Sequence, residues 1–470
     1  METKCNIEGL EFQGLGKRGV MGRFDGGTIT SDAGGLLLRE IDERMGITKR
    51  FSGCFTDYRN PGSIEHEVSA LVRQRVYGIA LGYEDLNDHD ELRSDPLLAV
   101  LCGKGDPRGD KRRYVRDKGK ALAGKSTLNR IELTEADADK DSRYKKIKCH
   151  GEKIDDIFVE VFLDSYREEP DWIVIDLDAT EDPVHGNQEG RFFHGYYKSY
   201  CYLPLYIFCG DHLLCARLRR SNIDASEGAV EELRRIVSQI RGRWPKVEIV
   251  IRADSGFCRE EIMRWCEDNG VGYILGLAKN SRLEKMIHED MVDAEILYRT
   301  RGKASRIYTE FLYQTRTSWS RPRRVIGKAE YLAKGPNPRF VVTSVPEEEI
   351  DARTLYEREY CARGDMENRI KEQQLYMFAD RTSTSKMRSN QIRLYFSSIA
   401  YVLLNALRRL GLKNTQLAKA QCHTIRLKLF KIGAQIRVTV RKVWVSLAEG
   451  YPYRDVFLKA YRNIRGEVLT

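Results

Sequence analysis

Two aspartates stand two residues apart at the end of an apolar run, WIVIDLD, which spans residues 172–178. The run is rich in β-branched residues and predicts a buried strand. Side chains at positions i and i+2 of a strand share a face, so Asp176 and Asp178 should point the same way. A carboxylate in a core strand is costly unless it is paired or binds a metal ion. The competing interpretation is a strand end where Asp meets solvent or caps the next turn.

A third aspartate repeats this pattern on a second predicted strand. VEIVIRAD, residues 247–254, ends its apolar run at Asp254 and continues into Ser-Gly. Ligands of open α/β sheets bind outside the carboxyl ends of the strands. Two such strands lying side by side would bring their terminal carboxylates together, whereas the alternative for Asp254 is a simple Asp–Ser turn.

A fourth acidic residue lies on a predicted helix. Tyr360, Arg363 and Glu367 are spaced i, i+3 and i+7, which places them on one helix face, and Lys371 extends that face by one turn. A charged face of this kind is usually solvated surface. Here the Tyr and Arg would also offer hydrogen-bond donors for a phosphate beside a carboxylate.

Carboxylates from two strand ends and one helix fit a site for two Mg²⁺ ions, which prefer oxygen ligands. Two such ions can activate a nucleophile and stabilise the leaving oxygen in a phosphoryl transfer. We expect Mn²⁺ to substitute for Mg²⁺. The hypothesis needs no histidine or serine nucleophile.

Two further segments carry residues of chemical interest. GKALAGKS, residues 119–126, matches a phosphate-binding loop, but no apolar strand precedes it, so no nucleotide cofactor is predicted. VHGNQEGRFFHGYYKSY, residues 184–200, is dense in Gly, His and aromatic residues. His194 and Tyr197 in this segment would lie near the catalytic centre and DNA, and the alternative is a structured turn with packed rings.

The elements that must position these residues predict an α/β fold. From residue 172 the order is three strands, a helix, a strand, a helix and a strand, which gives a mixed sheet covered by helices. We expect a mainly helical N-terminal region with a charged linker that serves in DNA binding or dimerisation, a catalytic domain with a β-rich insertion, and a helical basic C-terminal region. Their expected bounds are 1–150 for the N-terminal region, 151–380 for the catalytic domain, about 281–347 for the insertion and 381–470 for the C-terminal region. Helices are predicted at about 351–378 and 385–411.

Charge and composition narrow the class of partner. The formal net charge is +10, and residues 381–470 hold 18 Lys and Arg against 3 Asp and Glu. A focused basic surface favours a nucleic acid partner, and a solubilising surface is the alternative. No apolar window is long enough for a membrane span. The 11 cysteines include no CxxC pair, so free thiols in the cytoplasm are expected.

Several motifs together resemble the IS1380 family of insertion-sequence transposases, within the IS4-like DDE group. They are DLDATEDPVHGNQEGRFFHGYYKSYCYLPLYIFCGD, VIRADSGFC and YCARGDMENRIKEQQ, with LRSDPLLAVLCG and LAGKSTLNRIE before them. The resemblance extends from about residue 25 to 460. It implies an RNase H-like catalytic fold and Mg²⁺-dependent cleavage and joining of double-stranded DNA at the inverted repeats of a mobile element. It also implies a homodimer in the DNA complex.

The resemblance assigns Asp178, Asp254 and Glu367 as the three acids that hold the metal ions, with Asp176 as a further candidate ligand. Asp178 is preferred to Asp176 because it precedes Ala-Thr at the strand end. The group's Y-x2-R-x3-E motif is met by Tyr360, Arg363 and Glu367, which makes the Tyr and Arg candidate DNA contacts. The group's Lys seven residues beyond the Glu is replaced by Gln374, and Lys371 is the candidate substitute. A nuclease that does not join DNA, and a DNA-binding protein without activity, are the rival functions.

Overall fold

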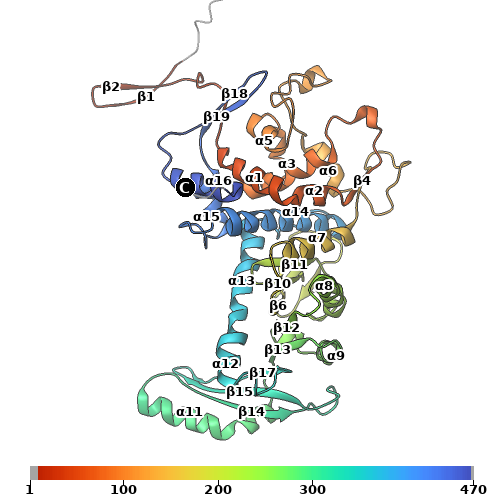
Figure 1. Cartoon of the computed structure of the whole chain (residues 1–470), viewed down its shortest axis with the longest axis vertical. Helices are drawn as coiled ribbons and strands as arrows, with labels where there is room; N and C mark the ends of the chain where they lie inside the picture. The colour runs from red at the N-terminus through yellow and green to blue at the C-terminus, as the bar shows by residue number, and fades with distance from the viewer. Residues whose placement is uncertain (1–8, 467–470) are drawn as a thin grey trace, which may run out of the picture. The chain divides into compact units, whose positions relative to one another are not determined.

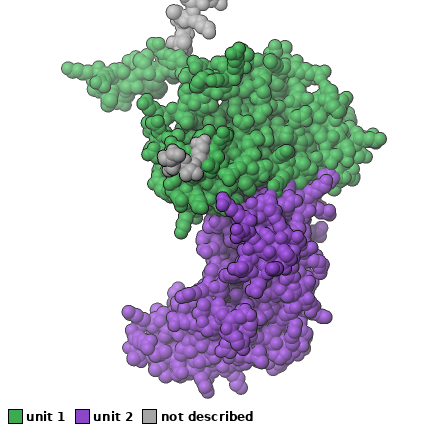
Figure 2. All heavy atoms as spheres, viewed as in Figure 1, with its two compact units in different colours: residues 1–148, 403–470 green, residues 149–402 purple. Residues whose placement is uncertain are grey.

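The computed structural model describes residues 9–466, and the chain divides into two compact units. Unit 1 combines residues 1–148 with 403–470, and unit 2 contains residues 149–402 (Figure 2). Unit 2 begins close to the expected start of the catalytic domain. The expected C-terminal region is divided, because residues 381–402 belong to unit 2 and the remainder to unit 1.

Unit 2 is built on one large mixed sheet (Figure 1). In spatial order its strands are β11 (His212–Arg217), β10 (Leu205–Cys209), β6 (Trp172–Ala179), β12 (Glu248–Ala253), β13 (Gly272–Leu277), β17 (Arg339–Thr343), β15 (Arg323–Leu332) and β14 (Ser305–Tyr313), with β16 (Gly335–Pro336) on β15. β12 pairs in parallel with both β6 and β13, and the other pairs are antiparallel. The predicted α/β class and the predicted order of strands and helices are confirmed, and the sheet is consistent with an RNase H-like core.

The alternation of side chains along β6 explains how its acids reach a functional face. Ile173, Ile175 and Leu177 are buried in a core formed with three helices, α7 (Gly151–Leu163), α8 (Ala229–Arg243) and α9 (Glu260–Asp268). Asp176 and Asp178 therefore face the opposite side of the sheet. On that side the ring of Phe208, which pairs with Asp176, packs on Tyr401 of α14 (Met387–Ala406) at 5.9 Å.

The segment predicted as a β-rich insertion is more mixed than expected. It starts with two helices, α10 (Ser281–Met286) and α11 (His288–Arg301), before β14. Ala294 is the one fully buried residue of α11, so the helix has almost no apolar stripe for a sequence pattern to reveal. The strands that follow continue the main sheet, since β17 pairs with β13.

A nearly continuous run of helical turns follows the sheet, as predicted for residues 351–378. It comprises α12 (Ala352–Thr354), η5 (Leu355–Tyr360), η6 (Cys361–Arg363), α13 (Gly364–Lys371) and η7 (Glu372–Tyr376). This run lies alongside the strands of the sheet (Figure 1). The second predicted helix is α14, which continues into η8 (Leu407–Gly411).

Unit 1 joins the two ends of the chain. Its elements are η1 (Ala33–Gly35), α1 (Leu36–Met45), α2 (Ile47–Ser52), β4 (Phe55–Asp57), η2 (Pro61–Ser63), α3 (Val68–Leu81), α4 (His89–Leu92), α5 (Pro96–Leu101), η3 (Val115–Asp117), α6 (Lys125–Glu132), α15 (Cys422–Ile425), η9 (Arg426–Phe430) and α16 (Arg454–Arg465), with five strands named below. A Cβ on Gly34 would lie 1.9 Å from the carbonyl oxygen of Leu429, so this contact between the two ends of the chain requires glycine.

Two hairpins in unit 1 differ from the expected helical character. β1 (Leu10–Leu15) pairs with β2 (Arg18–Gly22) as a ribbon that buries none of its residues. β18 (Ala434–Val438) pairs with β19 (Val443–Leu447) and with β3 (Ile29–Thr30). The alternation in QIRVTV and KVWVSL was the sequence signal for the second hairpin.

β5 (Ile147–Cys149) precedes α7, and two short strands, β7 (Asp182–Pro183) and β8 (Phe192–His194), pair with β9 (Ser199–Tyr202) between β6 and β10. None of the helices within residues 9–466 has both the length and the apolar composition needed to cross a membrane.

Candidate active site

Asp178 and Asp254 come from neighbouring parallel strands that end at the same edge of the sheet. Asp178 is the penultimate residue of β6, and Asp254 directly follows β12, whose Ala253 pairs with Leu177. The carboxylate of Asp254 accepts a hydrogen bond from the backbone N–H of Gly256 at 2.8 Å and so caps the turn after β12. The structure therefore brings the two acids to one edge, as the strand pattern predicted.

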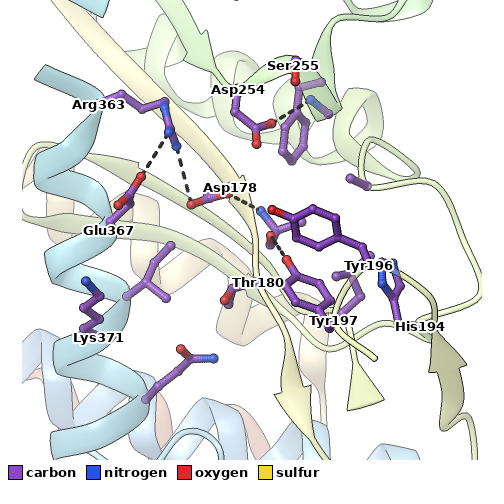
Figure 3. A pocket seen from close by; sticks show the side chains of 17 residues that line it. Asp178, Thr180, His194, Tyr196, Tyr197, Asp254, Ser255, Arg363, Glu367 and Lys371 are labelled. Carbon is purple, nitrogen blue, oxygen red and sulfur yellow. Dashed lines mark hydrogen bonds and ion pairs between the residues drawn. The ribbon is translucent and has the colours of Figure 1, made fainter. Parts of the chain in front are cut away.

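Glu367 approaches the same place from α13. Its Oε1 accepts a hydrogen bond from the Arg363 guanidinium at 3.0 Å, and that guanidinium lies 3.8 Å from Asp178. Arg363 thus lies between the first and third acids, with Asp254 across the opening from them (Figure 3). The spacing of four residues on one helix face makes the Arg363–Glu367 pair possible.

The three acids line a single cavity of about 620 Å³ (Figure 3). Four of the five residues proposed as DNA contacts also line it, namely Arg363, Lys371, His194 and Tyr197. The rest of the lining is formed by Ala179, Thr180, Tyr196, Leu203, Ala225, Ser255, Gly256, Phe257, Ile370 and Gln374. The cavity thus combines carboxylates with cationic and aromatic side chains, a combination that can hold a phosphodiester.

Burial and charge alter the acidity of Asp178. Burial raises its pKa to about 7, the Arg363 guanidinium opposes that rise, and the charges of Asp254 and Glu367 add to it. The acids therefore lie close enough to repel one another. A cation in the cavity would relieve that repulsion and favour the ionised form of Asp178.

The donor chemistry of the cavity fits a hard divalent cation, because three carboxylates supply oxygen ligands. Within residues 9–466, however, no group of three or more His, Cys, Asp and Glu side chains converges to hold a metal ion. The Arg363 guanidinium lies between two of the three carboxylates, at 3.8 Å from Asp178 and 3.0 Å from Glu367. A metal ion would have to replace this guanidinium charge.

Asp176, the further candidate ligand, has a different environment from Asp178. Its two carboxylate oxygens accept hydrogen bonds from Arg252 at 2.6 and 2.8 Å. Burial raises the pKa of Asp176, and the Arg252 guanidinium opposes that rise. Asp176 is not part of the cavity lining, so the structure does not bring it together with the other three acids.

Of the aromatic residues proposed as DNA contacts, His194 and Tyr197 line the cavity and Tyr360 does not. Tyr197 packs against His194 with ring centroids 4.9 Å apart, and its hydroxyl donates to the carbonyl of Ala179 at 3.4 Å. Burial raises the pKa of Tyr197 to about 12, so it remains a donor. Tyr360 is not among the lining residues, and its hydroxyl lies over Gly276 of β13.

Ten lining residues lie outside the predicted site, and three of them have polar groups of interest. Tyr196 is 81% exposed and packs its ring against Tyr197, and its signal was the aromatic density of residues 192–200. Gln374, which stands where the IS4-like group has Lys, donates to the carbonyl of Glu181 at 3.0 Å. Ser255 is brought in by the Asp254 turn and had no separate signal.

The segment 119–126, whose sequence matches a phosphate-binding loop, contacts other residues of unit 1. Its Lys125 ammonium lies 3.4 Å from Asp90 and donates to Asn87 at 3.2 Å. A 3₁₀ turn, η3, precedes the segment where a phosphate-binding loop would follow a strand.

Comparison with known proteins agrees with this geometry. The model of the family described as Transposase DDE domain group 1 matches residues 12–468, nearly the whole chain. A search of curated proteins finds no match. The chain therefore belongs to this family of DDE transposases, which act in DNA transposition, are typically catalytic phosphoryl transferases and generally use divalent metal ions.

Proposed function

We propose that this chain is the transposase of an insertion sequence of the IS1380 type, within the IS4-like DDE group. It binds the terminal inverted repeats of the element, cleaves DNA at the element ends and joins the freed ends to target DNA. The observation that carries the proposal is that Asp178, Asp254 and Glu367, from three separate elements, line one cavity together with Arg363 and Lys371. The motif resemblance around these residues supports the assignment to the IS1380 type.

We assign Asp178, Asp254 and Glu367 as the ligands of two Mg²⁺ ions, for which Mn²⁺ can substitute. When bound, such ions would activate a water molecule or a DNA 3′-hydroxyl as the nucleophile and would stabilise the leaving oxygen of the phosphodiester. Asp254 is held in place by its hydrogen bond to Gly256, whereas Glu367 and Asp178 must exchange the Arg363 guanidinium for the metal ions.

The released guanidinium has a second use in this scheme. Arg363 and Lys371 lie eight residues apart on one helical run, about two turns from each other, and can neutralise the non-bridging oxygens of the scissile phosphate. Tyr197 and His194 line the opposite part of the cavity and would position the sugar and base next to that phosphate. Tyr360 supports the Asp254 turn through its contact with Gly276.

The proposal is tested with the DNA that flanks the coding region as substrate. Asp254→Asn and Glu367→Gln keep the shape of each side chain but remove its charge, so each should reduce Mg²⁺-dependent cleavage by at least about 10³-fold. Binding to the same DNA, measured by electrophoretic mobility shift, should remain within a few-fold of wild type.

The outcomes separate the rival functions. Cleavage that persists in all three single variants, including Asp178→Asn, contradicts the assignment of the acids. A wild-type protein that cleaves the ends but cannot join pre-cut ends to a target duplex is a nuclease without strand transfer. A wild-type protein that binds the ends without cleaving them is a DNA-binding protein that has lost activity.

Joining two ends requires two copies of the site, so we also propose a homodimer in the DNA complex. Light scattering after size-exclusion chromatography should give the mass of two chains with two DNA ends. One chain on one DNA end under conditions that support joining would contradict the dimer.

A further inference from the structure

The β18–β19 hairpin of unit 1 is a short ribbon with an exposed outer edge. β18 pairs with β3 on one side and with β19 on the other, so β19 is the edge strand. The turn is closed by Thr439, whose backbone N–H donates to the carbonyl of Lys442 at 2.8 Å and whose Oγ1 accepts from the Lys442 N–H at 3.1 Å. The side chain of Val440 at the tip is fully exposed.

The ribbon lies in an unusually basic part of the chain. From Arg381 to Ala448 the sequence contains fourteen Lys and Arg residues and no Asp or Glu. Three of these cations, Arg437, Arg441 and Lys442, are on the hairpin, and all three are exposed. Cations gathered without carboxylates repel one another, so the folding of unit 1 gives no reason for this arrangement.

An exposed indole completes the surface. Trp444 is 48% exposed and pairs in register with Arg437 across the ribbon. The Arg437 guanidinium lies 5.9 Å and the Lys442 ammonium 5.4 Å from the centre of the Trp444 ring. The ring thus holds two cations on the exposed surface of the hairpin rather than beside carboxylates.

These features fit the backbone of duplex DNA. A two-stranded ribbon has the width to enter the major groove, and Arg and Lys side chains along it would reach the phosphates that border the groove. Repeated positive charge with no acidic residue on the hairpin itself matches a regularly charged polyanion better than a protein surface of mixed charge.

We propose that the β18–β19 hairpin is a DNA-binding ribbon that contacts the phosphate backbone of duplex DNA through Arg437, Arg441 and Lys442. This inference rests on the proposed function, because it assigns part of the DNA contact of the transposase to one element outside the catalytic cavity. Contacts to phosphates do not depend on the base sequence, so the ribbon should bind element ends and unrelated duplex DNA equally well.

The test is a triple variant of the full-length protein, Arg437→Gln, Arg441→Gln and Lys442→Gln. Binding to the flanking DNA of the gene, and to an unrelated duplex of equal length, is measured by fluorescence anisotropy at several salt concentrations. Loss of three phosphate contacts should lower the slope of log K against log salt by about 2 to 3 and weaken binding about 100-fold near 0.1 M salt. Both duplexes should be affected equally.

A matched control removes the same charge from unit 2. Lys285, Lys303 and Lys334 are exposed, and their triple change to Gln should leave the salt slope nearly unchanged if the effect belongs to the hairpin. An equal loss in the control variant, or unchanged binding in the hairpin variant, overturns the proposal, and in the second case the basic surface serves a partner other than DNA.

The thermal midpoint of the hairpin variant should lie close to that of wild type, because the changed side chains are exposed and their contacts with the Trp444 ring are weak. If the hairpin variant binds like wild type while wild type cleaves its ends, the hairpin assignment alone fails. A wild-type protein that neither binds nor cleaves DNA overturns both this inference and the proposed function.

Discussion

Asp176 and Asp178 share a face of β6, but their neighbours give them different chemistry. Arg252 of the adjacent strand satisfies both oxygens of Asp176, whereas Asp178 faces a cavity with two other acids. A buried ion pair stabilises a fold only while both partners remain. Asp176 is therefore set apart by Arg252 on the neighbouring strand, and Asp178 by its position at the strand end, where it faces the cavity and Arg363.

Asp176→Asn should destabilise unit 2 without removing the chemistry of the cavity. It leaves the Arg252 guanidinium buried without a charged partner, so the free energy of unfolding should fall by about 3 kcal/mol. Cleavage per folded molecule should persist. The measurement is urea unfolding followed by a cleavage assay below the transition.

The double variant Asp176→Leu with Arg252→Met serves as the control, because replacing both charges with apolar groups should recover much of the stability. Wild-type stability together with abolished cleavage in Asp176→Asn would instead identify Asp176 as a metal ligand.

Arg363 occupies the space between two acids, so it should compete with metal ions in the DNA-free protein. Arg363→Ala removes that competing charge, and we expect Mn²⁺ to bind about tenfold more tightly by calorimetric titration. The same variant should cleave DNA at least about 100-fold more slowly, because a phosphate contact is lost. Arg363→Lys keeps the charge, so its Mn²⁺ affinity and its cleavage rate should lie between those of wild type and Arg363→Ala. Weaker Mn²⁺ binding in Arg363→Ala than in wild type would contradict this account.

At the scale of elements, the site depends on a close approach between β13 and the helical run after β17. A Cβ on Gly276 would lie 2.5 Å from the Tyr360 hydroxyl and 3.0 Å from the backbone nitrogen of Ser255. Gly276 therefore lets η5 pack directly on the turn that carries Asp254. The Y-x2-R-x3-E spacing fixes the helix face, but this glycine fixes how near that face comes to the strands.

Gly276→Ala should displace the Asp254 turn and lower both stability and activity. Overpacking of this kind costs about 1–3 kcal/mol, and cleavage should fall more than DNA binding does. Tyr360→Phe in the Gly276→Ala background should recover part of the stability, because the closest atom is removed. Gly272→Ala is the matched control on the same strand, since its Cβ would meet the Val250 side chain at 3.2 Å and the nearest backbone atom, the Ile249 carbonyl oxygen, at 3.6 Å. Equal losses in Gly276→Ala and the control would refute the argument.

At the scale of the whole molecule, the two ends of the chain form one unit that is held together by buried and partly buried polar contacts. The Lys431 ammonium pairs with Asp32 at 2.5 Å, and the Arg426 guanidinium donates to the carbonyl of Ala80 at the end of α3 at 2.9 Å. Two buried histidines, His66 and His89, lie in the N-terminal part of this unit. The N-terminal helices and the basic C-terminal segment should therefore lose structure together.

Unit 1 should lose stability as the pH falls below about 6.5. Burial lowers the pKa of His66 and of His89 to about 3 from an ordinary value of 6.5. The unfolded chain binds these protons first, so the stabilisation is complete above pH 6.5 and disappears as the pH falls toward 3. Between pH 6.5 and 4.5 each histidine should cost about 2–3 kcal/mol of unfolding free energy.

Urea unfolding at several pH values measures this loss. His89→Gln retains a hydrogen-bonding group for Gln74, which lies 3.2 Å from the His89 ring nitrogen, but removes the titration. The variant should show about half of the wild-type pH dependence, and an unchanged dependence would count against the histidine explanation.

The sequence by itself determined the local features of this protein. Apolar runs that end in Asp178 and Asp254 and the helical face that carries Glu367 follow from side-chain periodicity within a few residues. The order of strands and helices in the sheet followed from the same signal, and the resemblance of several motifs indicated a DDE transposase, which the family match confirms.

Only the tertiary structure decided which residues meet. The pairing of Arg252 with Asp176, the position of Arg363 between two acids and the continuation of the sheet by β17, β15 and β14 join residues far apart in the chain. The assembly of both chain ends into unit 1 likewise joins residues that are far apart in the chain. Such contacts depend on the packing of whole elements, and the periodicity of a single segment records which face is buried but not what covers it.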